Sequence, residues 1–135
     1  MKKTIGEIMA RDVVTLRRND SLKFGRDIMN QKRIRHFPVL DSGKVVGVVS
    51  QRDLYRASLA SVLKYEEKTE NAFLDNLSVQ AVMSEPAVTA APGTPISEAA
   101  RLMAEKKVGC LPVVDNEKLV GMVTETDFLK VLAES

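Results

Sequence analysis

The chain has 135 residues, of which 44% are hydrophobic and 28% are charged, and its formal net charge is +2. This is the length and composition of one ordinary globular domain with a modest core. No apolar stretch is long enough to span a bilayer, and the lysine-containing N-terminus lacks the apolar core of a signal peptide. One cysteine excludes an internal disulfide, and a single histidine beside it argues against a metal cluster, so we expect a cytoplasmic protein without a metal site.

The charge is divided unevenly along the chain. Residues 1–67 hold 14 Lys and Arg against 8 Asp and Glu, whereas residues 68–135 hold 6 against 10. Such asymmetry often reflects solubility alone. The alternative is that the basic half faces an anionic ligand, so the positions of its basic residues matter.

In the first half of the chain, apolar periodicity and turn residues predict five elements in a row. In chain order they are a strand at 13–15, a helix at 21–31, strands at 37–40 and 45–49, and a helix at 51–63. Asn19-Asp20-Ser21 supplies N-cap chemistry for the first helix, and Ser50 caps the second. The second helix is expected to turn Leu54, Tyr55, Leu59 and Val62 inward.

The second half repeats this order at an offset of 74 residues, and residues 5–58 laid over 79–132 give 13 identical pairs. Its expected elements are a strand at 87–89, a helix starting at Thr94-Pro95, strands at 111–114 and 119–123, and a closing helix capped by Thr124. One supersecondary unit is therefore used twice, which implies a pseudo-twofold axis with two related clefts. We predict a first repeat over 1–63, a connector over 64–78 and a second repeat over 79–135.

The repeated unit is β-α-β-β-α, an α/β fold with α+β-like order, and its last strand runs into Gly-x-x-Ser/Thr-x-x-Asp. The matching stretches are Phe37–Asp41 with Gly47–Asp53, and Leu111–Asp115 with Gly121–Asp127. Together, at the same offset, they resemble the cystathionine-β-synthase (CBS) domain over nearly the whole chain. The resemblance implies a Bateman module of two pseudo-symmetric units packed through their sheets, commonly paired into a disk-shaped homodimer. It also implies clefts between the units that bind AMP, ADP, ATP, NAD or S-adenosylmethionine.

The Ser/Thr-x-x-Asp element lies where a strand becomes a helix, so unpaired backbone N–H groups and the positive end of the helix dipole coincide. Ser50 and Thr124 could bond a phosphate oxygen there, and Asp53 and Asp127 could accept both hydroxyls of a ribose. The same pattern is also an ordinary capping arrangement. The repeat and the family resemblance favour the ligand-binding interpretation.

The two repeats differ in the residues that could contact a phosphate. The first carries Arg35 and His36, and Arg52 directly before Asp53. The equivalent positions of the second repeat hold Gly109, Cys110 and Thr126. In the resembled family, basic residues at these positions often contact phosphates, and an arginine can do so with two parallel bonds. We therefore predict unequal clefts: one with Arg35, His36 and Arg52 on phosphates and Thr124 and Asp127 on the ribose, the other with Ser50 and Asp53. The second cleft lacks basic partners and is either empty or takes a less charged ligand such as an adenosine moiety, and the sequence leaves open which aspartate serves which cleft.

Four further residues have to be interpreted. Thr15 and Thr89 match a family position that can line the pocket, although a hydroxyl at a strand edge explains them equally well. His36 could be an ordinary surface histidine. Cys110, among apolar neighbours, is expected to be a small buried core residue.

No catalytic constellation can be assembled without using His36 each time, and no phosphate-binding Gly-x-x-x-x-Gly-Lys loop is present. We therefore predict a regulatory module that is not an enzyme and senses an adenosine-containing nucleotide, with Mg²⁺ involved only beside a polyphosphate. The alternative is a dimerisation or partner-docking module with no bound nucleotide. A nucleic-acid binder ranks last, because no run interleaves basic and aromatic residues.

Overall fold

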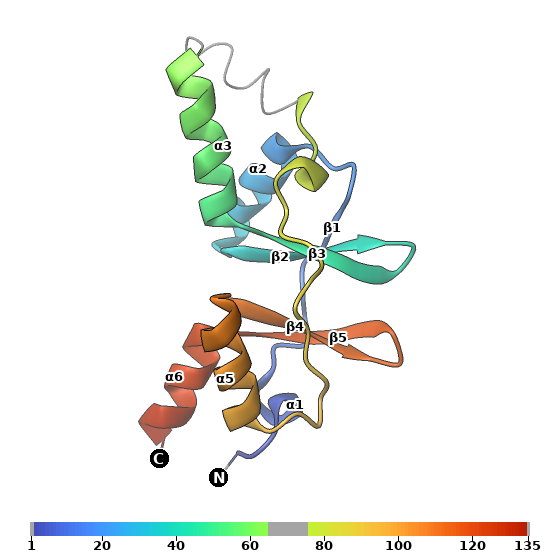
Figure 1. The fold of residues 1–135 in the computed structure, drawn as a ribbon, viewed down its shortest axis with the longest axis vertical. Coiled ribbons are helices and arrows are strands. Elements are labelled where there is room, and N and C mark those ends of the chain that lie inside the picture. The colour runs from blue at the N-terminus through green and yellow to red at the C-terminus, as the bar shows by residue number, and fades with distance from the viewer. Residues whose placement is uncertain (1, 65–75, 135) are drawn as a thin grey trace. The chain divides into compact units, whose positions relative to one another are not determined.

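The computed structural model describes residues 2–64 and 76–134, and it divides into two compact units (Figure 1). The first unit consists of Val14–Ser42 and the chain from Val46 to Pro86. The second consists of the chain up to Val13, the short piece Gly43–Val45, and the chain from Ala87 onward. The connector predicted over residues 64–78 lies largely outside the described residues.

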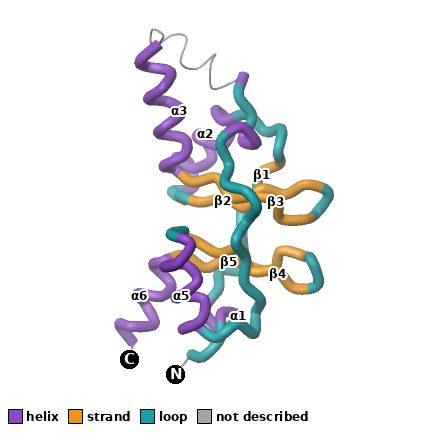
Figure 2. Tube along the Cα trace, in the orientation of Figure 1, coloured by secondary structure: helices purple, strands orange, loops and turns teal. Residues whose placement is uncertain are grey.

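The first unit is a three-stranded sheet with two α-helices on one side of it (Figure 2). Its elements are β1 (Leu16–Arg17), α2 (Leu22–Lys32), β2 (His36–Asp41), β3 (Lys44–Ser50), α3 (Gln51–Lys64) and the 3₁₀ turn η1 (Val79–Ala81). The strand order is β1-β2-β3, and β1 runs parallel to β2 with Leu16 opposite Val39.

The second unit repeats this arrangement around a two-stranded sheet. Its elements are α1 (Ile5–Ile8), α5 (Ile96–Lys106), β4 (Cys110–Asp115), β5 (Lys118–Thr124) and α6 (Glu125–Glu134). β4 and β5 are antiparallel, and the place of a first strand is taken by one parallel bridge between Ala90 and Val113. The predicted order of helices and paired strands is thus confirmed in both halves.

The strands predicted at residues 13–15 and 87–89 are wrong in position. The ladder contact begins one residue later, at Leu16 and at Ala90, and both of these residues are buried. Residues 13–15 are only half-buried and belong to no strand. The β-branched residues 13–15 suggested a strand. The backbone pairing is instead made at Leu16, the residue whose side chain lies in the core.

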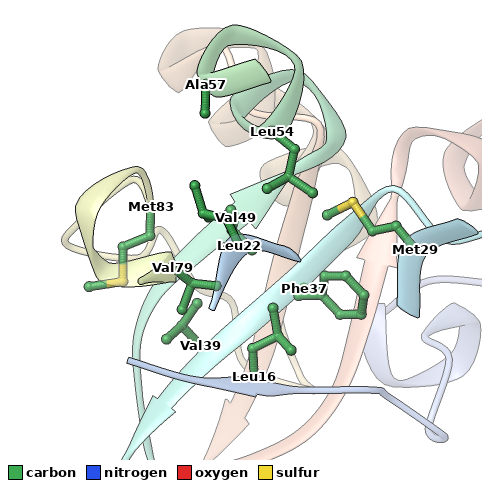
Figure 3. Packing of buried hydrophobic residues seen from close by; sticks show 10 residues of the cluster. All are labelled: Leu16, Leu22, Met29, Phe37, Val39, Val49, Leu54, Ala57, Val79 and Met83. Atoms are coloured by element: carbon green, nitrogen blue, oxygen red, sulfur yellow. The ribbon is translucent and has the colours of Figure 1, made fainter. Parts of the chain in front are cut away.

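Each unit has its own hydrophobic core. Figure 3 shows the first, in which Phe37 and Leu16 lie beside Val39 beneath α2 and α3. The second core gathers Leu111, Val113 and Val123 from the sheet with Ala99 and Met103 from α5. The apolar character of the buried strand residues is therefore explained by packing in the two cores.

The inward face predicted for α3 is partly wrong. Leu54 is buried, but Tyr55 is 63% exposed and Leu59 is 61% exposed. The helix buries the narrow stripe formed by Leu54 and Ala57, three residues apart, and the side chain of Val62 lies outside the described residues. Two large apolar side chains therefore remain on the surface of the first unit.

The borders of the units do not follow the repeats, because each unit includes the opening segment of the other repeat. Ser84 bonds β3 through Val48 in the first unit, with N···O distances of 2.9 and 3.1 Å. In the second unit Ala10 bonds β5 through Met122, with both distances 2.9 Å. The two bridges are equivalent under the 74-residue offset.

These two bridges explain why the Gly-x-x-Ser/Thr-x-x-Asp motif begins with glycine in both repeats. A Cβ on Gly47 would lie 2.8 Å from the carbonyl oxygen of Ser84, and one on Gly121 would lie 2.8 Å from that of Ala10. Side chains do not tolerate such contacts with backbone. The glycine is thus required by the passing segment, independently of any ligand.

Candidate functional site

The N-terminus of α3 is closed by reciprocal bonds between Ser50 and Asp53. One carboxylate oxygen of Asp53 accepts from the Ser50 backbone N–H at 2.7 Å and from its hydroxyl at 2.9 Å. The Asp53 N–H in turn donates to the Ser50 hydroxyl oxygen at 3.2 Å. This is a capping box, so the Ser50 cap predicted from the sequence is confirmed, and both side chains already have partners within the chain.

The N-terminus of α6 carries the same pattern with fewer bonds. The Asp127 carboxylate accepts from the Thr124 N–H at 2.9 Å. No bond of the Thr124 hydroxyl is present among the described residues, so the predicted cap by this side chain is wrong. Instead, the Asp127 carboxylate makes the side-chain capping bond of α6, by accepting from the backbone N–H of the residue at the end of β5. The Thr124 hydroxyl thus remains available to a ligand.

Backbone N–H groups at these two helix starts are also partly used. Gln51 donates to the carbonyl oxygen of Arg35 at 2.8 Å, and Glu125 donates to that of Gly109 at 3.2 Å. In α3 the Ser50 hydroxyl oxygen accepts from the Asp53 N–H as well. In α6 no side chain of the described residues accepts from the corresponding N–H of Asp127. The side-chain cap that would compete with an anion for the N–H groups at the start of α3 is therefore missing at the start of α6.

The basic residues predicted to contact phosphate gather around the start of α3. The Gln51–Arg35 bond joins the residue before β2 to the first turn of α3, which carries Arg52. Arg35 and Arg52 are exposed, and neither forms an ion pair with a described residue. His36 begins β2 and is half-buried. The structure thus brings Arg35 and Arg52 to one end of the first unit, with positive charge free to meet an anion.

Arg56 is a further basic residue that the sequence prediction did not single out. It is exposed and follows Arg52 by four residues on α3, so the two side chains share one face of the helix. The signal that could have found it is this spacing, which extends the positive face by one helical turn. Its equivalent in the second unit is Lys130.

The positions of the second unit that correspond to Arg35, His36 and Arg52 are uncharged. Thr126 is exposed on α6, Gly109 precedes β4, and Cys110 is 3% exposed at the first position of that strand. Burial raises the pKa of the Cys110 thiol from 9.0 to about 12, because the thiolate would lose its hydration. The prediction of a buried core cysteine is confirmed, and a thiol held protonated in this way is a poor nucleophile.

The two threonines predicted to line a pocket lie in different surroundings. Thr15 is half-buried directly before β1. Thr89 is exposed and lies on the rim of an open depression of about 530 Å³ within the second unit. The depression is otherwise lined by Ala90, Ala91, Thr94, Glu98, Arg101, Leu102, Glu105 and Val114. Of the predicted site residues it contains only Thr89, so it is distinct from the two helix starts.

Within residues 2–64 and 76–134, no group of three or more His, Cys, Asp and Glu is placed to hold a metal ion. In the same part of the chain, no helix has the length and apolar character needed to cross a membrane.

Comparison with known proteins places these features in a family. The model of the CBS domain matches residues 5–60 and again residues 79–134. A CBS domain-containing protein of Dictyostelium discoideum is 31% identical over 134 residues, covering 98% of this chain and 92% of the relative. A homoserine O-acetyltransferase of Methanohalobium evestigatum is 33% identical over 132 residues, but that match spans only 24% of the enzyme.

Solved structures agree with this assignment. The crystal structure described as a putative acetoin utilization protein (AcuB) from Vibrio cholerae has a TM-score of 0.82 and 32% identity, covering 97% of this chain and 92% of the other. The structure of CBSX2 in complex with AMP has a TM-score of 0.80 and 25% identity, covering 98% of each chain.

Proposed function

Because the chain belongs to the CBS domain family, we propose that it is a regulatory module that binds an adenosine-containing nucleotide. The observation that carries this proposal is the start of α6, where the carboxylate of Asp127 is half-buried and the Thr124 hydroxyl is without a partner among the described residues. An ionised carboxylate accepts hydrogen bonds from both hydroxyls of a ribose. The AMP complex of CBSX2, 25% identical over nearly the whole chain, supports the same ligand class.

The basic group of the first unit supports a phosphorylated ligand. Arg35 and Arg52 are exposed, and their charges are not neutralised by a described carboxylate. Each guanidinium can donate two parallel hydrogen bonds to phosphate oxygens. We therefore propose a phosphate-bearing ligand, AMP, ADP, ATP or NAD, ahead of S-adenosylmethionine, with His36 as a further phosphate contact. Mg²⁺ would accompany only a polyphosphate, as its charge partner.

Ser50, Asp53, Thr15 and Thr89 are proposed as secondary contacts. Ser50 and Asp53 satisfy each other's hydrogen-bonding groups, so a ligand would have to replace those bonds. The proposed regulation needs no catalysis by this chain. Binding that favours one arrangement of the module shifts its population, and a partner protein reads the shift.

The second candidate function is dimerisation or docking without a nucleotide. Large apolar side chains lie on the surface of both closing helices: Tyr55 and Leu59 on α3, and Leu129 and Leu132 on α6, the last 70% exposed. Clustered apolar side chains on a protein surface often mark an interaction site. We propose that these helix faces form a homodimer. Sedimentation equilibrium of Tyr55→Glu with Leu129→Glu should then give a monomer, with wild type a dimer.

Isothermal titration calorimetry against AMP, ADP, ATP, NAD and S-adenosylmethionine, with and without Mg²⁺, tests the proposed function. We expect micromolar binding of at least one adenine nucleotide. The absence of heat with every ligand, from protein shown to be folded by circular dichroism, would contradict nucleotide sensing and favour the docking module.

A further inference from the structure

The N-terminal segment Lys3–Ala10, here called the strap, is held on the second unit by a set of specific backbone bonds. Ile5 donates to the carbonyl oxygen of Thr94 at 2.9 Å, and Gly6 donates to that of Pro92 at 2.8 Å. The ladder pair of Ala10 and Met122 closes the far end. The Ile5 side chain is completely buried in the second core. The strap is therefore an integral part of this unit.

A second segment of the chain, residues 77–84, docks on the first unit in the equivalent way. Val79 donates to the carbonyl oxygen of Asp20 at 2.8 Å, and Gln80 donates to that of Arg18 at 3.1 Å. Val79 is completely buried in the first core. The same bonds, offset by 74 residues, thus serve both units.

The two segments carry matching anchors, so their apolar residues do not distinguish the docking sites. Ile5 corresponds to Val79, Ile8 to Val82 and Met9 to Met83. An interior accepts exchanges between such similar apolar side chains at small cost. Something other than the anchors must assign each segment to its unit.

The segments differ sharply at Gly6, whose equivalent is Gln80. A Cβ on Gly6 would lie 3.1 Å from the carbonyl oxygen of Pro92 and 3.3 Å from its Cβ. That oxygen is also the acceptor of the Gly6 N–H bond, so Pro92 cannot retreat without loosening the strap. In the first unit Arg18 stands in place of Pro92, the bond is longer at 3.1 Å, and Gln80 is exposed.

We propose that the contact between Gly6 and Pro92 is a selectivity element that lets the second unit accept the strap and reject the glutamine-bearing segment 77–84. The docking site on the second unit takes only a segment with glycine at this position. Docking of segment 77–84 on the second unit, within one chain or between two copies, is thereby excluded. This inference is independent of any nucleotide.

Amide hydrogen exchange of the full-length chain, followed by NMR, tests the proposal through the sign of the effect. Gly6 lies in α1, where alanine is ordinarily the better helix former, so Gly6→Ala would slow opening of the strap if space were available. We expect the opposite: exchange of the Ala10 and Met122 amides at least tenfold faster, and faster still in Gly6→Gln. The Ser84 and Val48 amides should change less than twofold.

Gln80→Ala is the matched control, because it retains a Cβ at the equivalent position of the first unit. Both pairs of amides should then exchange within twofold of wild type. Slower or unchanged exchange of Ala10 and Met122 in Gly6→Ala would overturn the proposal. An equal acceleration in Gln80→Ala, at Ser84 and Val48, would also overturn it. If Gly6→Gln is too unstable to study, Gly6→Ala decides alone.

Discussion

The N-termini of α3 and α6 have the same sequence pattern and the same fold around them, yet their hydrogen bonding differs. At α3 the hydroxyl and the carboxylate are bonded to each other, with three bonds between Ser50 and Asp53. At α6 one bond joins Thr124 to Asp127. Arg35 and Arg52 lie near the first of these sites, whereas the equivalent positions of the second unit hold Gly109 and Thr126. The comparison teaches that a repeated motif can act as a structural cap in one unit and leave polar groups for a ligand in the other.

The largest expected effect concerns the two aspartates. Asp127→Ala should weaken nucleotide binding by roughly 1.5–3 kcal/mol, the usual range for a hydrogen bond to a charged group. Asp53→Ala should change affinity less and instead lower the free energy of unfolding by about 1 kcal/mol, because it loses the capping box. Titration calorimetry and urea unfolding of both variants separate the two effects. Equal losses of nucleotide affinity in the two variants would contradict the proposed difference between the starts of α3 and α6.

The charge difference between the units predicts a change in ligand preference. Arg35→Ala combined with Arg52→Ala should reduce the preference for ATP or AMP over adenosine by about tenfold, as charge-assisted bonds are lost. Competition binding with the three ligands measures this ratio. Thr126→Ala, at the position on α6 that corresponds to Arg52, is the control and should leave the ratio unchanged. A uniform loss for all three ligands would contradict a phosphate role.

Cys110 and His36 occupy equivalent strand positions, and the buried thiol predicts a pH effect. Burial raises the pKa of Cys110 to about 12 in the folded protein, against 9.0 for an ordinary thiol. Well below pH 9 both states keep the proton, so stability is unaffected. Above it only the unfolded state loses the proton, so this thiol makes stability fall as pH rises, by about 1.4 kcal/mol at pH 10.

Urea unfolding of wild type and Cys110→Ala at several pH values from 8 to 10 measures this effect. The stability difference between them should be constant up to about pH 8 and then shift increasingly against wild type. A difference that stays constant up to pH 10 would show that the folded thiol ionises normally.

The smallest expected effect is on the caps themselves. Ser50→Ala should lower the free energy of unfolding by about 1 kcal/mol, since a cap bond is lost. Thr124→Ala should cost only a few tenths of that, because its hydroxyl makes no cap bond in the described chain. Chemical denaturation of the two variants gives the comparison. A larger loss for Thr124→Ala would reverse the assignment of caps.

The repeat and its Gly-x-x-Ser/Thr-x-x-Asp motif were sufficient to predict the order of elements and the family. They were not sufficient to predict that Asp127 rather than Thr124 caps α6, because a capping pattern is compatible with several hydrogen-bond arrangements. The exposure of Tyr55 was also missed, since helical periodicity does not show how wide a buried stripe is. The role of Gly121 depends on Ala10, more than a hundred residues earlier in the chain, and no local pattern encodes such a contact.

The inequality of the two helix starts is tested most directly by the stoichiometry of nucleotide binding. Wild-type chain should be titrated calorimetrically with the adenine nucleotide that binds most tightly, at a protein concentration well above its Kd. We expect one tight equivalent per chain, with any second equivalent at least tenfold weaker. Two equivalents of equal affinity, or none, would contradict it.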